Sequence, residues 1–331
     1  MSAEHSWLTP VLRQALGVGV SDLLSDEEVT DLLIGVGGHV LERRRGTEWR
    51  EPEGPALRLD ASRRNLILHS LAGALDVELS EARPTVEGSL GDGRVRIQGF
   101  GAEVSGKPNV VFRLQPKVRM QLEDLVERKM LDRATAGFLF RELYEHRATL
   151  VVAGVTGSGK TTLAGALMRE VLKVQPFVRW VVVEEESKEL RLDDRALGGE
   201  LPGSAVLPMV TTEVVELDSE ALLRRALRAA ADRIAVGEVR GKEAAVFYSA
   251  ASTGHDGSVL TIHAAEPDKV PIRLSQCAAQ GGVMISAEMF CEVVDYIVQV
   301  EVDLGERRVS GVYRYNDNAP GWEKVEVPDE E

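Results

Sequence analysis

The chain has 331 residues, of which 44% are hydrophobic and 28% charged, and its formal net charge at pH 7 is −14. This length and composition are typical of a globular protein with two domains. The sequence has no run of 18 or more apolar residues, and residues 1–7 lack the basic start and apolar core of a signal peptide. We therefore expect neither a membrane span nor a secreted protein.

The charge and the cysteines narrow the range of partners and compartments. Both the first 115 residues and the remainder are net acidic, so we expect no direct nucleic-acid binding. Cys277 and Cys291 form neither a disulfide framework nor a zinc ribbon, and we expect both to be buried packing residues. This cysteine usage favours a reducing cytoplasm.

Residues 1–115 mix helix and strand signals, which predicts a smaller α+β N-terminal domain. A capping-box pattern from Ser25 to Glu28 predicts the start of a helix-like segment that leads into Val29–Ile34. The apolar spacing of residues 60–75 predicts an amphipathic helix that ends near Asp76. Strands are predicted in a small hairpin around Gly46 and at residues 84–88, 94–98 and 109–113.

Residues 116–120 are predicted to link this domain to a second one, residues 121–331, which begins with two helices. Strands and helices then alternate, which is typical of a parallel sheet covered by helices, so we expect an α/β domain. The predicted helices are 122–127, 132–146, 160–173, 219–230 and 241–252, and the predicted strands are 149–153, 178–184, 233–237, 257–262, 296–301 and 308–313.

The segment Gly154–Thr161, directly after the apolar run 149–153, fits the phosphate-binding pattern G-x-x-x-x-G-K-[ST] without a mismatch. In this motif, backbone N–H groups and the positive end of the following helix dipole converge on a phosphate. We expect Lys160 to reach the β- and γ-phosphates of ATP and Thr161 to hold Mg²⁺. The residues expected to contact the nucleotide here are Gly154, Thr156, Gly157, Ser158, Gly159, Lys160, Thr161 and Thr162.

The alternative for this segment is a glycine-rich turn that binds nothing. The apolar strand before the segment and the helix after it favour nucleotide binding over that alternative. Gly157 and Gly159 also allow backbone angles, and a close approach of the ligand, that a Cβ atom would block.

Carboxylates follow two later strands, at the edge of a parallel sheet where ligands bind. The strand at 178–184 ends in three acids, Glu184–Glu186, which lie either near Mg²⁺ and the attacking water or in a solvated loop. Glu238 follows the strand at 233–237, and we expect the sheet order to place it beside the phosphate-binding segment. A glutamate there suits polarising a water. Arg240 either balances phosphate charge or pairs with Glu238.

Two of the six histidines, His255 and His263, fall within nine residues of each other. A histidine near a γ-phosphate can donate a hydrogen bond and report the nucleotide state. Their spacing is equally compatible with one core histidine and one surface histidine, so the residues alone leave this open.

Four segments in this order resemble the Walker A loop, Asp box, Walker B segment and His box of the type II/type IV secretion ATPase superfamily: Gly154–Thr161, Glu185–Leu190, Asp232–Gly241 and Thr253–His263. The resemblance implies a RecA-like P-loop ATPase domain with a parallel-rich central sheet. It also implies functional roles for His255 and His263, and it favours Glu185 within the acidic run, as a residue that supports the Mg²⁺–water network.

Upstream segments resemble, more weakly, the conjugal-transfer (TrbB-like) and tight-adherence branch of this superfamily. They are Val29–Ile34, Gly91–Arg96, Val111–Leu114 and Leu122–Leu125. This branch implies a homohexameric ring in which the nucleotide sits between the two domains. Arg113 matches an arginine position that can approach the nucleotide.

The chain also departs from the family pattern. Glu186 replaces the usual aspartate of the Asp box, and Ala230–Ala231 replaces an Arg-Pro pair before the Walker B strand. These changes indicate a divergent member, with altered subunit contacts or slow turnover.

The resemblance predicts a cytoplasmic, ATP-hydrolysing ring motor at the inner face of the cytoplasmic membrane that powers a type IV secretion or conjugation machine. Its expected catalytic residues are Glu238, Glu185, His263 and His255. One alternative is a pilus assembly or retraction ATPase, and another is a nucleotide-gated scaffold that hydrolyses little ATP. A motor that acts directly on DNA is disfavoured by the net charge of −14.

Overall fold

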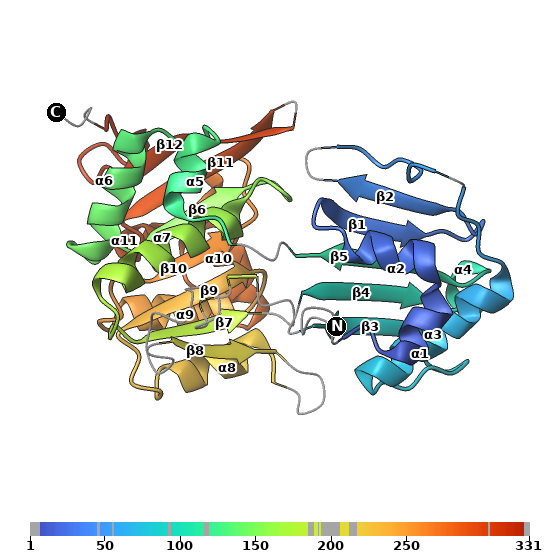
Figure 1. The fold of residues 1–331 in the computed structure, drawn as a ribbon. Coiled ribbons are helices and arrows are strands. Elements are labelled where there is room, and N and C mark those ends of the chain that lie inside the picture. The colour runs from blue at the N-terminus through green and yellow to red at the C-terminus, as the bar shows by residue number, and fades with distance from the viewer. Residues whose placement is uncertain are drawn as a thin grey trace. The chain divides into compact units, whose positions relative to one another are not determined.

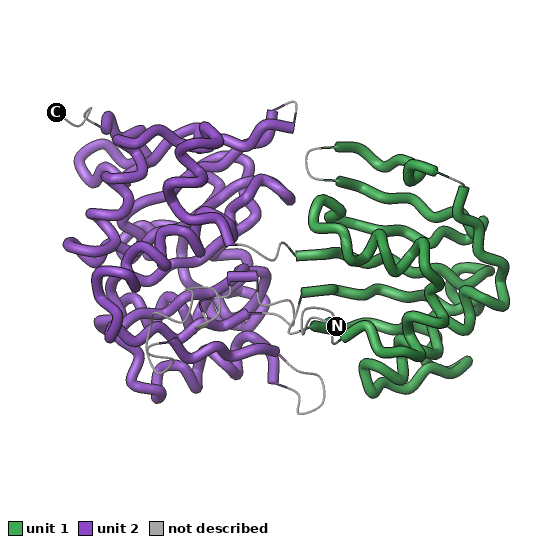
Figure 2. The backbone as a smooth tube through the Cα atoms, in the orientation of Figure 1, with its two compact units in different colours: residues 1–117 green, residues 118–331 purple. Residues whose placement is uncertain are grey.

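The structure, a computed structural model, describes residues 7–44, 47–54, 56–91, 94–115, 119–184, 189–190, 192, 206–211, 217–303 and 305–327. It divides into two compact units, residues 1–117 and 118–331 (Figure 2). The predicted linker, residues 116–120, spans the division between them, and residues 116–118 lie outside the described part.

The first unit is an antiparallel sheet with helices packed on one face. The strand order is β2-β1-β5-β4-β3. Alternate residues of the strands, such as Leu32, Ile97 and Phe112, are fully buried against the helices. The strands are β1 (Val29–Ile34), β2 (Val40–Arg44), β3 (Thr85–Leu90), β4 (Val95–Phe100) and β5 (Asn109–Leu114), and the helices are α1 (Pro10–Leu16), α2 (Val18–Ser25), α3 (Ala61–Leu75) and α4 (Ala102–Ser105).

The predicted helix over residues 60–75 is confirmed by α3, whose N-cap Asp60 accepts a hydrogen bond from the backbone N–H of Arg63. The helix-like segment from Ser25 is wrong. Ser25 ends α2, and its hydroxyl donates to the carbonyl of Ser21 at 2.8 Å. Val29–Ile34 is a strand because it pairs with both β2 and β5, and this tertiary pairing outweighs the local capping signal.

The second unit is an eight-stranded sheet in the order β13-β12-β11-β6-β10-β9-β7-β8 (Figure 1). The six strands from β11 to β8 are parallel, and β12 and β13 extend the sheet antiparallel at one side. The strands are β6 (Leu150–Gly154), β7 (Trp180–Glu184), β8 (Val206–Val210), β9 (Arg233–Val239), β10 (Val259–Ile262), β11 (Tyr296–Asp303), β12 (Glu306–Tyr315) and β13 (Trp322–Lys324).

Helices cover both faces of this sheet, because its strands are apolar on both sides. Leu150 and Val152 of β6 pack with the helices of one face, and Val151 and Ala153 pack with those of the other. The first face carries α5 (Leu122–Glu127), α6 (Arg133–Tyr144) and α7 (Lys160–Val174); the second carries α8 (Ser219–Ala226), α9 (Glu243–Ala251), α10 (Lys269–Gln280) and α11 (Ala287–Val293). The predicted α/β domain after a smaller α+β domain is thus confirmed.

The strand before Glu238, β9, is not the direct neighbour of the phosphate-binding strand β6, because β10 lies between them. The order of parallel strands depends on how the crossover helices pack, which the local sequence does not encode.

Candidate nucleotide site

The loop from β6 to α7 has the geometry that the phosphate-binding pattern requires. A Cβ atom at Gly154 would lie 2.2 Å from the carbonyl oxygen of Val300, so only glycine fits there. Gly157 (φ 76°) and Gly159 (φ 96°) occupy the left-handed region that favours glycine. The sequence therefore folds this loop tightly against β11 and turns it directly into the first residue of α7, Lys160.

This loop offers several donors to an anion. The first intrahelical bond of α7 runs from the N–H of Leu163 to the carbonyl of Gly159, so the N–H groups of the first turn have no helical partner. The Oγ atom of Ser158 is buried and has no hydrogen-bond partner among the described residues. Thr161 is half-buried in the same turn, whereas Thr156 and Thr162 are exposed. Orphaned donors at a helix N-terminus fit the phosphates of a nucleotide.

Lys160 lies beneath this loop. Its side chain is largely buried, and Nζ donates to the carbonyl of Val155 at 3.0 Å and lies 3.2 Å from Nδ1 of His263. Burial lowers the pKa of Lys160, and the nearby Glu238 carboxylate opposes that shift. The ammonium is therefore held within reach of the loop by partners that a phosphate can replace.

Glu238, His263 and Lys160 form a continuous chain of contacts, although they come from three separate segments of the chain. His263 follows the end of β10, and its Nε2 atom lies 2.5 Å from Oε1 of Glu238, near the end of β9. The second carboxylate oxygen of Glu238 lies 2.5 Å from Nη2 of Arg240. Parallel strands end at the same edge of a sheet, which brings these groups to the loop.

His263 lies between a carboxylate and an ammonium. Burial lowers the pKa of His263, an effect that the Glu238 carboxylate opposes, and the lowered pKa favours the neutral imidazole. Its Nε2 atom faces Glu238, and its Nδ1 atom faces the Lys160 ammonium. His263 therefore connects the carboxylate to the lysine across the strand that separates β9 from β6.

His255 does not join this chain of contacts. It precedes β10, and its Nδ1 atom lies 3.3 Å from the carbonyl of Ala250. The backbone carbonyl of the adjacent Asp256 accepts a hydrogen bond from Arg147, which precedes β6. This turn therefore lies at the end of the sheet where the parallel strands begin, which we call the amino edge. A four-residue strand separates the two histidines, which places them at least roughly 10 Å apart. The expected role of His255 at a γ-phosphate of the same chain is corrected accordingly.

The remaining predicted residues stay predictions. Glu185 and Glu186 lie outside the described residues. Arg113 belongs to the first unit, where its Nε atom lies 3.1 Å from Oδ1 of the buried Asp31. Arg43 contacts the other oxygen of Asp31 at 2.7 Å, so that the carboxylate fixes the stem of Arg113 while the guanidinium stays half exposed.

The structure adds two residues that the sequence did not single out. Glu243 accepts hydrogen bonds from the N–H groups of Arg240 (2.6 Å) and Gly241 (2.9 Å), which fixes the turn after Glu238. Arg307 of β12 donates to the carbonyl of Gly157 at 2.8 Å. The only signal for Glu243 was an acid at the start of a helix, and Arg307 had none, because it reaches the loop from a distant hairpin.

Glu184, the first of the three acids predicted after the apolar strand, is the last residue of β7. Its side chain is 6% exposed, and burial raises the pKa of its carboxyl to about 7. Oε1 accepts from the backbone N–H of Leu190 at 2.6 Å. Gly237 makes room for this side chain, because a Cβ atom at Gly237 would lie 3.0 Å from Cγ of Glu184. The signal in the sequence was an acid that continues an apolar strand.

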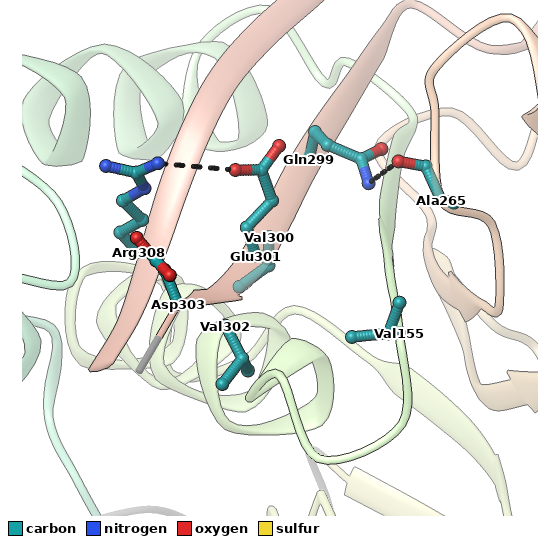
Figure 3. Close-up of a pocket in the computed structure, with 8 residues that line it drawn as sticks. All are labelled: Val155, Ala265, Gln299, Val300, Glu301, Val302, Asp303 and Arg308. Carbon is teal, nitrogen blue, oxygen red and sulfur yellow. Dashed lines mark hydrogen bonds and ion pairs between the residues drawn. The ribbon is translucent and has the colours of Figure 1, made fainter. Parts of the chain in front are cut away.

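A pocket of about 300 Å³ lies beside the phosphate-binding loop (Figure 3). Val155 of the loop forms one side, and the end of β11 forms another. Gln299 donates to the carbonyl of Ala265 at 3.1 Å, and Glu301 lies 3.7 Å from Arg308. Asp303 adds a second carboxylate, so this pocket is poorly suited to a phosphate.

The chain is similar to known proteins of one family. The family model described as "Type II/IV secretion system protein" matches residues 92–302. The chain is 30% identical over 322 residues to a probable conjugal transfer protein TrbB of Sinorhizobium fredii, covering 97% of this chain and 94% of that protein. It is also 30% identical over 332 residues to the type IV secretion system protein PtlH of Bordetella pertussis, covering 90% and 93%.

Solved structures share the fold. The Yersinia pseudotuberculosis ATPase DotB matches with a TM-score of 0.61 and 16% identity, over 91% of this chain and 79% of that one. The pilus retraction motor PilT with bound ADP matches with a TM-score of 0.57 and 17% identity, over 92% and 82%. Of the helices in the described part of the chain, none is long and apolar enough to span a membrane.

Proposed function

The chain belongs to the type II/IV secretion system protein family, and from this premise we propose that it is an ATP-hydrolysing ring motor of a type IV secretion or conjugation machine. The observation that carries the proposal is the contact chain from Glu238 through His263 to Lys160, beside a loop built for phosphate. It joins a carboxylate that can orient water to the lysine that would bind the phosphate being cleaved.

In this proposal each residue has one task. Lys160 leaves His263 and Val155 to bind the β- and γ-phosphates, and the N–H groups of the first turn of α7 bind alongside it. Glu238 orients the attacking water and takes its proton. His263, released from Lys160, donates to the γ-phosphate or to the attacking water. Arg240 balances the charge of Glu238 before the nucleotide binds.

The residues also fit the metal that such a reaction uses. Thr161 would hold Mg²⁺ through its hydroxyl, and the ion, when bound, would neutralise charge on the β- and γ-phosphates. The half-buried position of Thr161 in the first turn of α7 supports this role. We propose that Glu185 supports the Mg²⁺–water network and that Arg113 approaches the nucleotide from the N-terminal unit.

We further propose that the chain assembles as a homohexameric ring and works at the cytoplasmic face of a membrane, with proteins of the secretion machine as partners. The type IV secretion and conjugal transfer relatives support this assignment. A pilus assembly or retraction ATPase is the second candidate, supported by the fold shared with PilT.

The proposal is tested by ATP hydrolysis at defined protein concentrations, with light scattering for mass, on the wild type and Lys160→Ala. Turnover that rises as the protein assembles, and disappears in the variant, supports a ring motor. Assembly and ATP binding without turnover in the wild type would contradict it and favour a nucleotide-gated scaffold. Deletion of the gene in its host, followed by assays of conjugation and of pilus formation, separates the two motor candidates.

A further inference from the structure

Arg169, on α7, is a cation in the core of the second unit. Its side chain is 2% exposed, and burial lowers its pKa to about 10. Within the described part of the chain, no carboxylate pairs with it. Burial keeps water away from the five N–H donors of a guanidinium. Such a group is therefore stable in a protein core only where other groups accept hydrogen bonds from these donors.

Two backbone carbonyls, far apart in the sequence, accept from this guanidinium. Nη2 donates to Met120 at 2.6 Å, and Nη1 donates to Leu190 at 3.3 Å. Met120 is the third residue of the second unit, directly after the connection from the first. Leu190 is a core residue shortly after the end of β7. A single side chain thus holds the start of the unit and the segment after β7 in one arrangement.

Gly165 indicates that this arrangement is built into the helix. Glycine disfavours the interior of a helix, and Gly165 lies in the middle of α7. A Cβ atom there would lie 3.0 Å from Nη1 of Arg169 and 3.3 Å from the carbonyl oxygen of Leu190. The missing side chain makes the room in which the guanidinium meets Leu190.

The peptide of Leu190 is held at both ends. Its N–H donates to the buried Glu184 at 2.6 Å, and its carbonyl accepts from Arg169. Glu184 is itself seated in the space that Gly237 leaves. The end of β7, at Glu184, is therefore tied through Leu190 to Arg169.

We propose that Arg169 is a positioning residue that couples the start of the second unit, at Met120, to Leu190 and through Leu190 to Glu184 at the end of β7. The proposal rests on the proposed function, because the end of β7 contributes to turnover only in an ATPase. Since the guanidinium is rigid and planar, a shift of Met120 moves Leu190 with it. Motion of the chain that enters the unit is thereby passed to Glu184, which lies against Gly237 next to Glu238.

The test compares Arg169→Met, which keeps the volume without the donors, with Arg169→Lys, which keeps a cation. Arg233→Met is the matched control: Arg233 is 1% exposed, has a pKa lowered to about 10, and donates to the carbonyls of Leu143 and Tyr144. We expect Arg169→Met to lower kcat about 10- to 100-fold while the Kd for ATP stays within about threefold. Arg169→Lys should recover part of kcat, and Arg233→Met should change kcat less than about threefold.

Hydrogen exchange of the full-length, assembled protein gives a second readout. In Arg169→Met, fragments that cover Met120 and Leu190 should exchange at least about tenfold faster. In the wild type, we expect ATP binding to change the exchange rate of both fragments. In Arg169→Met, the two fragments should no longer change together. The control should keep the wild-type pattern. If Arg169→Met does not fold, Gly165→Ala, which crowds Nη1 instead of removing the charge, takes its place.

An Arg169→Met protein with wild-type kcat, or with wild-type exchange at Leu190, overturns the proposal. A wild type without turnover overturns the proposed function instead, and the two results are distinguishable because exchange is measured without hydrolysis. In that case the exchange experiment still tests the coupling. If ATP binding no longer changes exchange at both the Met120 and the Leu190 fragments of Arg169→Met, the coupling is supported, and if both changes remain, the coupling is overturned.

Discussion

The two edges of the eight-stranded sheet hold charged groups in different ways. At the amino edge, charged side chains bond to backbone groups: Arg233 donates to the carbonyl of Tyr144, and Asp295 accepts from the N–H of Thr149. At the carboxyl edge, where the parallel strands end, the side chains of Glu238, His263 and Lys160 contact one another. The side-chain contacts of Glu238, His263 and Lys160 can be exchanged for contacts with a ligand.

This difference distinguishes charged residues that stabilise the fold from those that we expect to act in ATP hydrolysis. Both edges contain a histidine of the same short segment and a buried cation, so residue type and burial alone do not distinguish them. The glycine-rich loop and the orphaned donors of α7 occur at the carboxyl edge. Substitutions of Glu238, His263 or Lys160 should therefore change activity, and those at the amino edge should change stability.

The largest effect is expected at Lys160. Lys160→Ala removes the ammonium that would bind the phosphates, so kcat/KM for ATP should fall about 1,000-fold, about 4 kcal/mol. Lys173→Ala, at the other end of α7, removes a half-exposed lysine paired with Glu170 and is the control. Steady-state hydrolysis measures both. If kcat/KM of Lys160→Ala stays within about tenfold of the wild-type value, the residues at the carboxyl edge do not carry out ATP hydrolysis.

The buried Glu184 should make stability depend on pH. Its pKa is about 7 in the folded protein and near 4.5 in the unfolded chain, so the folded state binds more protons between these values. The free energy of unfolding should therefore fall as pH rises from about 4.5 to about 7, by up to about 3 kcal/mol. Urea unfolding at pH 5 and pH 7 should show this slope reduced in Glu184→Gln. An equal slope in both proteins would contradict the assignment.

The two histidines give a direct comparison of the edges. His263→Ala should lower kcat about 100-fold, because it removes the group that connects Glu238 to Lys160. His255→Ala should leave kcat within about twofold, since His255 lies before β10 at the amino edge. Turnover numbers of the two variants at saturating ATP measure this difference. Equal losses would mean that the separation of the two edges has no functional meaning.

The smallest effect is expected at Asp295. Asp295→Ala leaves the N–H of Thr149 without its acceptor and should lower the free energy of unfolding by about 1 kcal/mol. Asp295→Asn keeps an acceptor oxygen and should cost less. Urea unfolding measures stability, and kcat should stay within about twofold for both variants. A large loss of kcat without a loss of stability would place a chemical role at the amino edge.

The sequence predicted those parts of the molecule that depend on local patterns. The apolar run before Gly154 and the glycines after it are enough to place a strand, a loop and a helix. The spacing in residues 60–75 is enough for α3. A capping pattern predicted a helix-like segment from Ser25, whereas the strand that follows it pairs with β5 and brings together residues 82 apart in the chain, such as Asp31 and Arg113.

Contacts between residues on different strands could not be predicted from local sequence patterns. His255 and His263 are close in the sequence, yet the intervening β10 places them at opposite edges of the sheet. Glu238 reaches Lys160 only through His263, because β10 separates their strands. Gly165 and Gly237 looked like ordinary glycines, and only the three-dimensional structure shows the charged side chains for which they make room.

The central claim is that Glu238 acts on the attacking water at the carboxyl edge, and Glu238→Gln tests it most directly. The amide keeps the size of the side chain but cannot take a proton. ATP binding, measured with a fluorescent analogue, should stay within about threefold of the wild type, while turnover should fall at least about 100-fold. Turnover within about threefold of the wild type, with binding intact, would contradict the account.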